Sequence, residues 1–412
     1  MNNQNMPLVS VITPSFNQAA FIEETIQSVL MQDYPYIEHI IVDGGSTDGT
    51  LDILKKYSYL GNRFCYISEP DRGQSHAINK GLKMAKGDII GWLNSDDTYL
   101  PGAVSKAVNA LRAHSEQAMV YGKGYHVDIN GQIINSYPVE PFDRERLYKF
   151  CIICQPAAFL RKNIFEIVGG VDENLDFCMD YDLWIRISKD YPIGYIEDYL
   201  ANSRLHPACK SQAHSIDKGL PEITKTSVKH FGTVANEWFY HYLYNHNEIE
   251  VFWYLDLFKK YNVLGASPQI IDMNRYSDLW VPPNFFVSIQ VEPQYPLHML
   301  LIKGMNHLVS DLRCGVLVNG SDIKKDNILS RGFTLEILVD SNASNNVIEI
   351  LSNKHIVPAE VGINSDTRAL SFQVEQVIPL SAQEYSFYQE FQKGPRYALA
   401  WMQRNRHPIP LL

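Results

Sequence analysis

The chain runs DIIGWLNSDD from Asp88 to Asp97, so a short apolar strand ends in two adjacent carboxylates. Similar apolar strands are predicted upstream, at residues 8–13, 38–42 and 64–68. The segments between them carry apolar residues at helical spacing. Strands and helices that alternate in this way predict an α/β domain, built on a mostly parallel sheet with helices on both faces.

A polar cluster directly follows each of these strands. The four clusters are residues 14–17, 43–48, 69–74 and 94–97. In sheets of this kind, ligands bind beyond the carboxyl ends of the strands. Because parallel strands end at the same edge of a sheet, the four clusters predict one shared ligand site.

The carboxylates of Asp96 and Asp97 suit a divalent cation. Oxygen ligands of this type hold Mg²⁺ or Mn²⁺ together with substrate phosphates. The same residues equally fit a helix cap, because Asp97 or Thr98 precedes a helix predicted to start near Pro101. The chain has no GxxxxGK[ST] motif, and no GxGxxG opens a helix after the first strand, which argues against a P-loop or dinucleotide-binding protein.

The overall composition is that of a folded globular protein with an acidic balance. Of 412 residues, 45% are hydrophobic, and 46 Asp and Glu outnumber 36 Lys and Arg, for a net charge of −10. This balance argues against a nucleic-acid partner. The polar N-terminus and the lack of an apolar run of about 18 residues predict a cytoplasmic protein without a membrane span. Cys151 and Cys154 form a lone CxxC, which we interpret as two reduced, buried thiols.

The pattern changes beyond residue 100. Asn130-Gly131 marks a β-hairpin. Further along, short alternating strands broken by Gly, Asn and Ser predict a β-sandwich. We therefore expect a first domain at 1–215, a helical linker segment at 216–284, a sandwich at 285–380 and a C-terminal tail at 381–412.

Three ordered strings carry a family resemblance. They are VSVITPSFNQ at 9–18, IIVDGGSTDGT at 40–50 and ISEPDRGQSHAINK at 67–80, and Asn94-Ser95-Asp96-Asp97 follows them. The chain resembles the inverting family-2 glycosyltransferases, which have the GT-A fold, over roughly residues 8–210. The resemblance implies a GT-A, Rossmann-like nucleotide-sugar transferase domain at 1–215.

The resemblance also implies a metal site of the DXD type. Asn94-Ser95-Asp96-Asp97 occupies that place, with Asp97 as the expected direct ligand of Mn²⁺ or Mg²⁺ and Asp96 nearer the ribose or a metal-bound water. His206 matches a position where related enzymes place a histidine near the metal and the diphosphate, and a structural role is equally open. Lys210 follows on the expected phosphate loop.

In this family the catalytic base lies at the start of a later helix, usually in a Glu-Asp pair. Here Met179 replaces the Glu, and the Asp is kept as Asp180, which is our expected base. Charge complementarity at a helix N-terminus is the alternative for Asp180 and the favoured interpretation of Asp182. Trp184 either faces the acceptor sugar or lies in the core.

The resemblance assigns nucleotide binding to the polar loops. The expected residues are Pro14, Ser15, Phe16, Asn17, Asp43, Asp71, Arg72, Gln74, Asn79, Ser95 and Asp96. The common Asp-Asp-Gly-Ser pattern is replaced by Asp43-Gly44-Gly45-Ser46, which weakens any inference about the base.

The function implied is a hexosyltransferase-like enzyme of cell-surface polysaccharide or lipopolysaccharide assembly. It moves one sugar from a nucleotide-diphosphate sugar, with a UDP-sugar preferred, to a glycan or lipid-linked acceptor. No Gln-x-x-Arg-Trp string of processive members is found, which favours single addition. The alternatives are a non-catalytic glycan-binding protein with a degenerate transferase domain, and a sugar-phosphate nucleotidylyltransferase.

Two further expectations concern the C-terminal half. The sandwich either holds glycan acceptors or forms a homo-oligomer interface. The tail carries Lys393, Arg396, Arg404 and Arg406 beside Tyr397 and Trp401. Such a mixture suits peripheral contact with the inner membrane face, while packing of Trp401 on the protein body is the alternative.

Overall fold

The computed structural model describes residues 6–245, 250–265, 268–307, 312–339, 341 and 343–406. These residues form two compact units, the first ending at Tyr242 and the second starting at Leu243, so that the boundary falls near the end of helix α10 (Asn236–Asn245). Along the described ranges, no helix combines the length and the apolar character that a membrane span requires.

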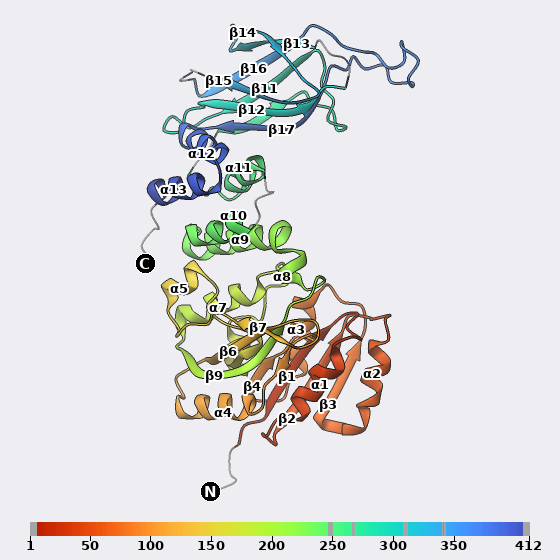
Figure 1. Ribbon diagram of the computed structural model, residues 1–412, viewed down its shortest axis with the longest axis vertical. Coiled ribbons are helices and arrows are strands. Elements are labelled where there is room, and N and C mark those ends of the chain that lie inside the picture. Colours follow the sequence, from red (N-terminus) through yellow and green to blue (C-terminus); the bar gives the residue numbers. More distant parts are fainter. Residues whose placement is uncertain are drawn as a thin grey trace. The chain divides into compact units, whose positions relative to one another are not determined.

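The first unit begins with the alternation that the sequence predicts (Figure 1). Its first elements are β1 (Val9–Ser15), α1 (Ile22–Leu30), β2 (Ile37–Asp43), α2 (Thr50–Lys56), a 3₁₀ turn (Ser58–Arg63), β3 (Phe64–Ser68), α3 (Gln74–Met84) and β4 (Ile89–Trp92). Strands β1 and β2 are buried at every residue, as expected of parallel strands covered on both faces.

The rest of this unit continues the sheet and adds further helices. Its elements are β5 (Thr98–Tyr99), α4 (Ala103–Ala113), β6 (Met119–Val127), β7 (Ile133–Ser136), α5 (Arg144–Lys149), a 3₁₀ turn (Gln155–Ala157), β8 (Ala158–Arg161), α6 (Lys162–Ile167), α7 (Met179–Asp190), β9 (Ile193–Arg204), α8 (Lys210–Ala213), a π-helical turn (Ser215–Gly219), α9 (Leu220–Phe231) and α10 (Asn236–Asn245). The hairpin predicted at Asn130-Gly131 joins β6 to β7, and Gly131 has the positive φ, 79°, that its turn requires.

Within the described part of the chain, nine strands form one sheet, in the order β3-β2-β1-β4-β8-β6-β9-β5 with β7 beside β6. Strands β3, β2, β1 and β4 are mutually parallel. The sheet then turns mixed, because β8 is antiparallel to both β4 and β6. The predicted α/β fold class is therefore confirmed, and its parallel half carries the polar loops.

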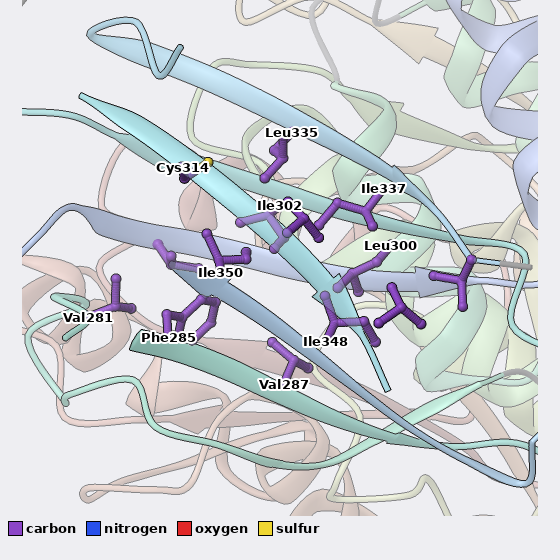
Figure 2. Close-up of a cluster of buried hydrophobic side chains, with 14 of the residues drawn as sticks. Val281, Phe285, Val287, Leu300, Ile302, Cys314, Leu335, Ile337, Ile348 and Ile350 are labelled. Carbon is purple, nitrogen blue, oxygen red and sulfur yellow. The ribbon is translucent and has the colours of Figure 1, made fainter. Parts of the chain in front are cut away.

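The second unit contains the predicted sandwich. Its elements are α11 (Val251–Lys260), β10 (Gln269–Met273), β11 (Asn284–Gln290), β12 (Met299–Met305), β13 (Arg313–Val318), β14 (Ser321–Ile328), β15 (Gly332–Leu338), β16 (Asn345–Ser352), β17 (Gln373–Leu380), α12 (Ala382–Gln392) and α13 (Pro395–Asn405). A five-stranded and a three-stranded antiparallel sheet share one apolar core, in which Phe285 and Ile350 of one sheet lie with Leu300 and Ile302 of the other (Figure 2). Alternating burial along β15 is the sequence pattern that predicts this architecture.

The predicted tail folds as α12 and α13, and its residues 407–412 lie outside the described residues. Trp401 is buried, and its Nε1 donates a hydrogen bond of 2.8 Å to Ser386 Oγ. Its ring packs edge-on against Phe387. Trp401 therefore packs against α12 within the tail, which favours packing of this indole over its exposure to a membrane.

Candidate active site

The loops after β1, β2 and β3 lie side by side at the carboxyl edge of the parallel strands. Ser15 pairs with Asp43 in the sheet register, and the N–H of Gly44 donates to the carbonyl of Ser15 at 2.8 Å. A Cβ atom on Gly44 would lie 2.9 Å from Oδ2 of Asp71. Three of the four predicted polar clusters are thus brought together by the backbone.

The Asp43 carboxylate is used inside its own loop. It accepts hydrogen bonds from the N–H groups of Gly45 and Ser46, at 3.1 and 2.9 Å, and from the hydroxyls of Ser46 and Ser68, at 2.5 and 2.6 Å. The residue is fully buried. Asp43 therefore shapes the loop and does not present its carboxylate to a nucleotide in this conformation.

The first loop is held against the second by Asn17, which has a positive φ of 53°. Its N–H donates to Ser46 Oγ at 2.7 Å, and its Oδ1 accepts from the N–H of Thr47 at 2.9 Å. Phe16, the residue before Asn17, is 60% exposed, so its ring is available to a ligand. Ser15 Oγ is buried and has no hydrogen-bond partner among the described residues. Pro14 pairs with Val42, one residue before the carboxyl end of the register between β1 and β2.

The third loop divides into two groups. Asp71 accepts the N–H of Gly73 at 2.8 Å and remains at the site. Arg72 and Asn79 instead bind Glu173, and Asn79 also bonds the backbone of Val171 in both directions. The structure therefore assigns Arg72 and Asn79 to holding residues 171–173, and not to the loops around Asp43.

Asn94 connects the third and fourth loops. Its Oδ1 accepts from Gln74 Nε2 at 2.8 Å and from Trp92 Nε1 at 2.9 Å. Its Nδ2 donates to Asp97 Oδ2 at 3.1 Å and to Gln155 Oε1 at 2.9 Å. Gln155 is a buried member of this network that the sequence analysis missed, because it lies 61 residues along the chain and in no motif.

The two adjacent carboxylates have different environments. Asp97 is 4% exposed, and its second oxygen, Oδ1, accepts the backbone N–H of Arg204 at 2.9 Å. Burial and the neighbouring Asp96 charge raise the pKa of Asp97 well above its usual range. Each oxygen of Asp97 thus accepts a hydrogen bond inside the protein, and its role as a direct metal ligand stays a prediction.

Asp96 is the more accessible of the pair, and it faces His206. Its Oδ2 lies 3.2 Å from His206 Nε2, and the imidazole contacts the Phe21 ring in a tilted arrangement with ring centroids 4.8 Å apart. Two ligands bound at about 2.1 Å in neighbouring octahedral positions lie about 3 Å apart, so this spacing fits a shared cation. No group of three or more His, Cys, Asp or Glu side chains with metal-site geometry occurs in the described ranges.

Arg204 holds the loop that carries Asp96 and Asp97, and the sequence analysis did not identify it. Its guanidinium donates to the carbonyl of Asp96 at 2.8 Å and pairs with Glu24 at 2.6 Å, although the arginine is only 3% exposed. Thr25 Oγ1 donates to the carbonyls of Ser95 and Asp97, at 2.9 and 2.8 Å. Arg204 lies two residues before His206, and this proximity was the only signal in the sequence.

Asp180 lies in the first turn of α7, as predicted. Its Oδ1 accepts the N–H of Tyr181 at 2.8 Å, and burial raises its pKa to about 6. Burial, then the charge of Asp97 and also that of Asp180, raise the pKa of the Cys154 thiol. Cys154 is a free thiol, like Cys151.

The neighbours of Asp180 on α7 have other roles. Asp182 is fully buried and lies 2.7 Å from both Arg186 Nε and His230 Nε2. Burial opposes its ionisation, but hydrogen bonds from His230 and Arg186 outweigh burial and hold the pKa of Asp182 well below its usual range. Trp184 is also fully buried, so its indole is not available to an acceptor sugar in this conformation.

Lys210 is paired within the protein. Its Nζ donates to Asp176 Oδ1 at 2.7 Å, and Lys218 binds the other oxygen of the same carboxylate. Burial of Asp176 disfavours its charge, but the hydrogen bonds from Lys210 and Lys218 prevail and lower its pKa to about 2. A phosphate reaching Lys210 would therefore compete with Asp176.

Comparison with known proteins agrees with the motifs. The family model for glycosyl transferase family 2 matches residues 10–169. An uncharacterized glycosyltransferase of Rickettsia prowazekii is 32% identical over 211 residues, covering 49% of this chain and 65% of that protein. The chondroitin synthase of Escherichia coli is 30% identical over 204 residues, 49% of this chain and 30% of that protein. This chain thus spans less than two thirds of the length of either relative.

Among solved structures, S. aureus TarS 1–349 in complex with UDP-GlcNAc aligns with a TM-score of 0.49 at 17% identity, covering 62% of this chain and 80% of that one. The family resemblance carried by the strings at 9–18, 40–50 and 67–80 is confirmed by the family model, which spans all three. Residues 10–169 thus match the glycosyl transferase family 2 model, and about half of the chain is similar to glycosyltransferases.

Proposed function

We propose that the chain transfers one sugar from a nucleotide-diphosphate sugar to a hydroxyl of a glycan or lipid-linked acceptor, with inversion and with a divalent cation. One observation carries the proposal within the family. Asp180, with its pKa raised to about 6, and Asp97, the neighbour of the Asp96–His206 pair, both act electrostatically on the Cys154 thiol. This supports the proposal that the proton acceptor and the candidate cation pair serve one site.

Asp96 and His206 are the residues that would hold Mn²⁺ or Mg²⁺. Such cations are commonly bound by one or two side chains and completed by substrate phosphates and water. When bound, the cation would offset the charge that develops on the diphosphate leaving group. Arg204 would support Asp96 by two hydrogen bonds, from its backbone N–H to the Asp97 carboxylate and from its guanidinium to the Asp96 carbonyl.

Asp180 would take the proton of the acceptor hydroxyl. The acceptor oxygen forms a bond to the anomeric carbon while the bond from that carbon to the diphosphate breaks, and the proton passes to Asp180 Oδ2 or Oδ1. A pKa of about 6 leaves Asp180 mostly ionised at pH 7, yet basic enough to accept that proton. Attack opposite the leaving group inverts the anomeric configuration.

The nucleotide would lie across the loops around Phe16 and Asp71, and we propose a UDP-sugar as the donor. Chondroitin synthase among the relatives supports a glycan as the product. Assembly of a cell-surface polysaccharide or lipopolysaccharide at the inner membrane face would fit such a product. A lipid-linked acceptor, membrane contact through the tail and homo-oligomerisation belong to this proposal.

The test uses the full chain with a panel of UDP- and GDP-sugars, Mn²⁺, Mg²⁺ or EDTA, and short glycan acceptors. Metal-dependent release of nucleoside diphosphate, with a product whose new linkage is inverted by NMR, is expected. Nucleotide binding without any turnover would favour the non-catalytic glycan-binding protein. Pyrophosphate release from a sugar 1-phosphate and a nucleoside triphosphate would favour the nucleotidylyltransferase.

A further inference from the structure

Helix α9 touches α7 on both sides of Asp180. This helix lies beyond the family match, which ends at residue 169, in the segment predicted as a helical linker. Three of its residues, Glu222, Thr226 and His230, are four residues apart and therefore share one face. All three contact α7 or the loop leading into it.

Glu222 holds the backbone just before α7. Its Oε2 accepts the N–H groups of Asp176, Phe177 and Cys178 at 3.2, 2.8 and 3.1 Å, and its Oε1 accepts that of Asp176 at 2.9 Å. The N-cap residue of α7, Cys178, makes no capping bond with its own side chain. A carboxylate from another helix thus orders the entry to α7, at the end where negative charge is favourable.

The second contact lies after Asp180. His230 Nε2 lies 2.7 Å from Asp182 Oδ1, and Lys229 Nζ lies 3.4 Å from the same oxygen. Between the two anchors, Cys178 Sγ lies 3.4 Å from Thr226 Oγ1. Residues 178 and 182 are therefore both tied to α9, and Asp180 lies between them.

Asp180 needs such support because its own carboxylate bonds the next residue of its helix, Tyr181. Its direction is set by the backbone of the first turn of α7. We infer that Glu222 is a positioning residue for Asp180, acting through the N–H groups of residues 176–178. The inference rests on the proposed function, in which Asp180 is the base.

The test compares Glu222→Met, which removes the acceptor oxygens at similar length, with Glu222→Gln, which keeps one. Lys225→Met, an exposed change on the same helix, is the matched control. Donor binding is measured by calorimetry, and kcat, KM and the pH profile by nucleotide release. Glu222→Met should lower kcat by about 10²-fold with donor affinity within about twofold, since a small displacement of a catalytic group costs that much. Glu222→Gln should recover most of kcat, and Lys225→Met should match wild type.

A double-mutant cycle with Asp180→Asn decides whether Glu222 acts through the base. In the Asp180→Asn background, Glu222→Met should cause no further loss of rate. Equal additional loss in both backgrounds would overturn the inference, as would unchanged kcat and pH profile in Glu222→Met. A parallel fall in thermal stability and donor affinity, shared by Glu222→Gln, would also overturn it in favour of a purely structural role. Failure of the proposed function is distinct, because the wild type itself would then release no nucleotide.

Discussion

His206 Nε2 lies 3.2 Å from Asp96 Oδ2, although the two residues are 110 positions apart in the chain. The imidazole is fixed on Phe21, and the Asp96 backbone is fixed by Arg204. Both partners are therefore held in place by buried contacts before any ligand arrives. A preformed pair of this kind costs little reorganisation when a cation binds.

Asp96→Asn removes one anionic ligand with almost no change in volume. We expect Mn²⁺-dependent nucleotide affinity to fall at least about tenfold, or about 1.4 kcal/mol, with metal-free affinity unchanged. Titration calorimetry with UDP, with and without Mn²⁺, measures both. Asp198→Asn, at an exposed position of β9 in the same sheet, is the control. A larger metal-specific loss in Asp97→Asn than in Asp96→Asn would return the direct ligand to Asp97.

Asp180→Asn should lower transfer by at least about 10²-fold while leaving nucleotide and metal affinity nearly unchanged, because a base acts on the acceptor side. In the wild type, kcat/KM should fall as the pH drops below about 6, since only the ionised carboxylate accepts a proton. A rate that stays level down to pH 5 would contradict this assignment.

The same residue affects stability with the opposite sign. Folding raises the pKa of Asp180 from 3.8 to about 6, so the fold favours its protonated form. Ionisation between pH 4 and 6 therefore costs the wild type stability, and the cost is complete above pH 6. Asp180→Asn should raise the free energy of unfolding at pH 7 by about 1–2 kcal/mol, measured by urea denaturation. A variant that is less stable than wild type at pH 7 would refute this prediction.

Asp182→Asn should instead destabilise the fold, by about 3 kcal/mol, because it leaves Arg186 and His230 without their buried counter-charge. The pKa of Asp182 is lowered by folding, so its contribution is present above about pH 4 and is lost as the pH falls further. Asp190→Asn, at the exposed end of α7, should change stability by less than about 0.5 kcal/mol. Similar effects of the two substitutions would show that the buried network contributes little.

His39 predicts a separate acid sensitivity. It is fully buried, its Nε2 lies 2.9 Å from Thr13 Oγ1, and burial lowers its pKa to about 3. The unfolded chain binds this proton near pH 6.5, so stability should decrease as the pH falls from 6.5 toward 3. His39→Gln should flatten that slope in urea titrations at pH 7, 6 and 5. An identical slope in the variant would exclude His39 as its source.

Local sequence patterns predicted the parallel half of the sheet but not the mixed half. Residues 8–13 and 38–42 are apolar runs with polar ends, and their pairing follows from strand alternation alone. The two-residue strand Thr98–Tyr99 has no such pattern and exists because it pairs with β9, about 100 residues away. Pairing between residues so far apart in the chain depends on tertiary packing, which the spacing of apolar residues within a short segment does not predict.

The candidate site shows the same division. The sequence located the carboxylates but could not tell which of Asp96 and Asp97 turns inward, since that depends on the backbone N–H of Arg204. The sequence could not show that the Asp43 carboxylate accepts hydrogen bonds within the protein, because one of the donors, Ser68, lies on another strand. Asp180 was predictable because its helix start and its family motif coincide.

Gly44 leaves room that the Asp71 carboxylate fills, with a virtual Cβ only 2.9 Å from Oδ2. The crowded atom is the tip of a side chain, so it can rotate away while the backbone stays in place. A single methyl group at position 44 would therefore displace the Asp71 carboxylate. If Asp71 lies beside the nucleotide, as we propose, a side chain at position 44 would change the shape of the donor site without replacing Asp71.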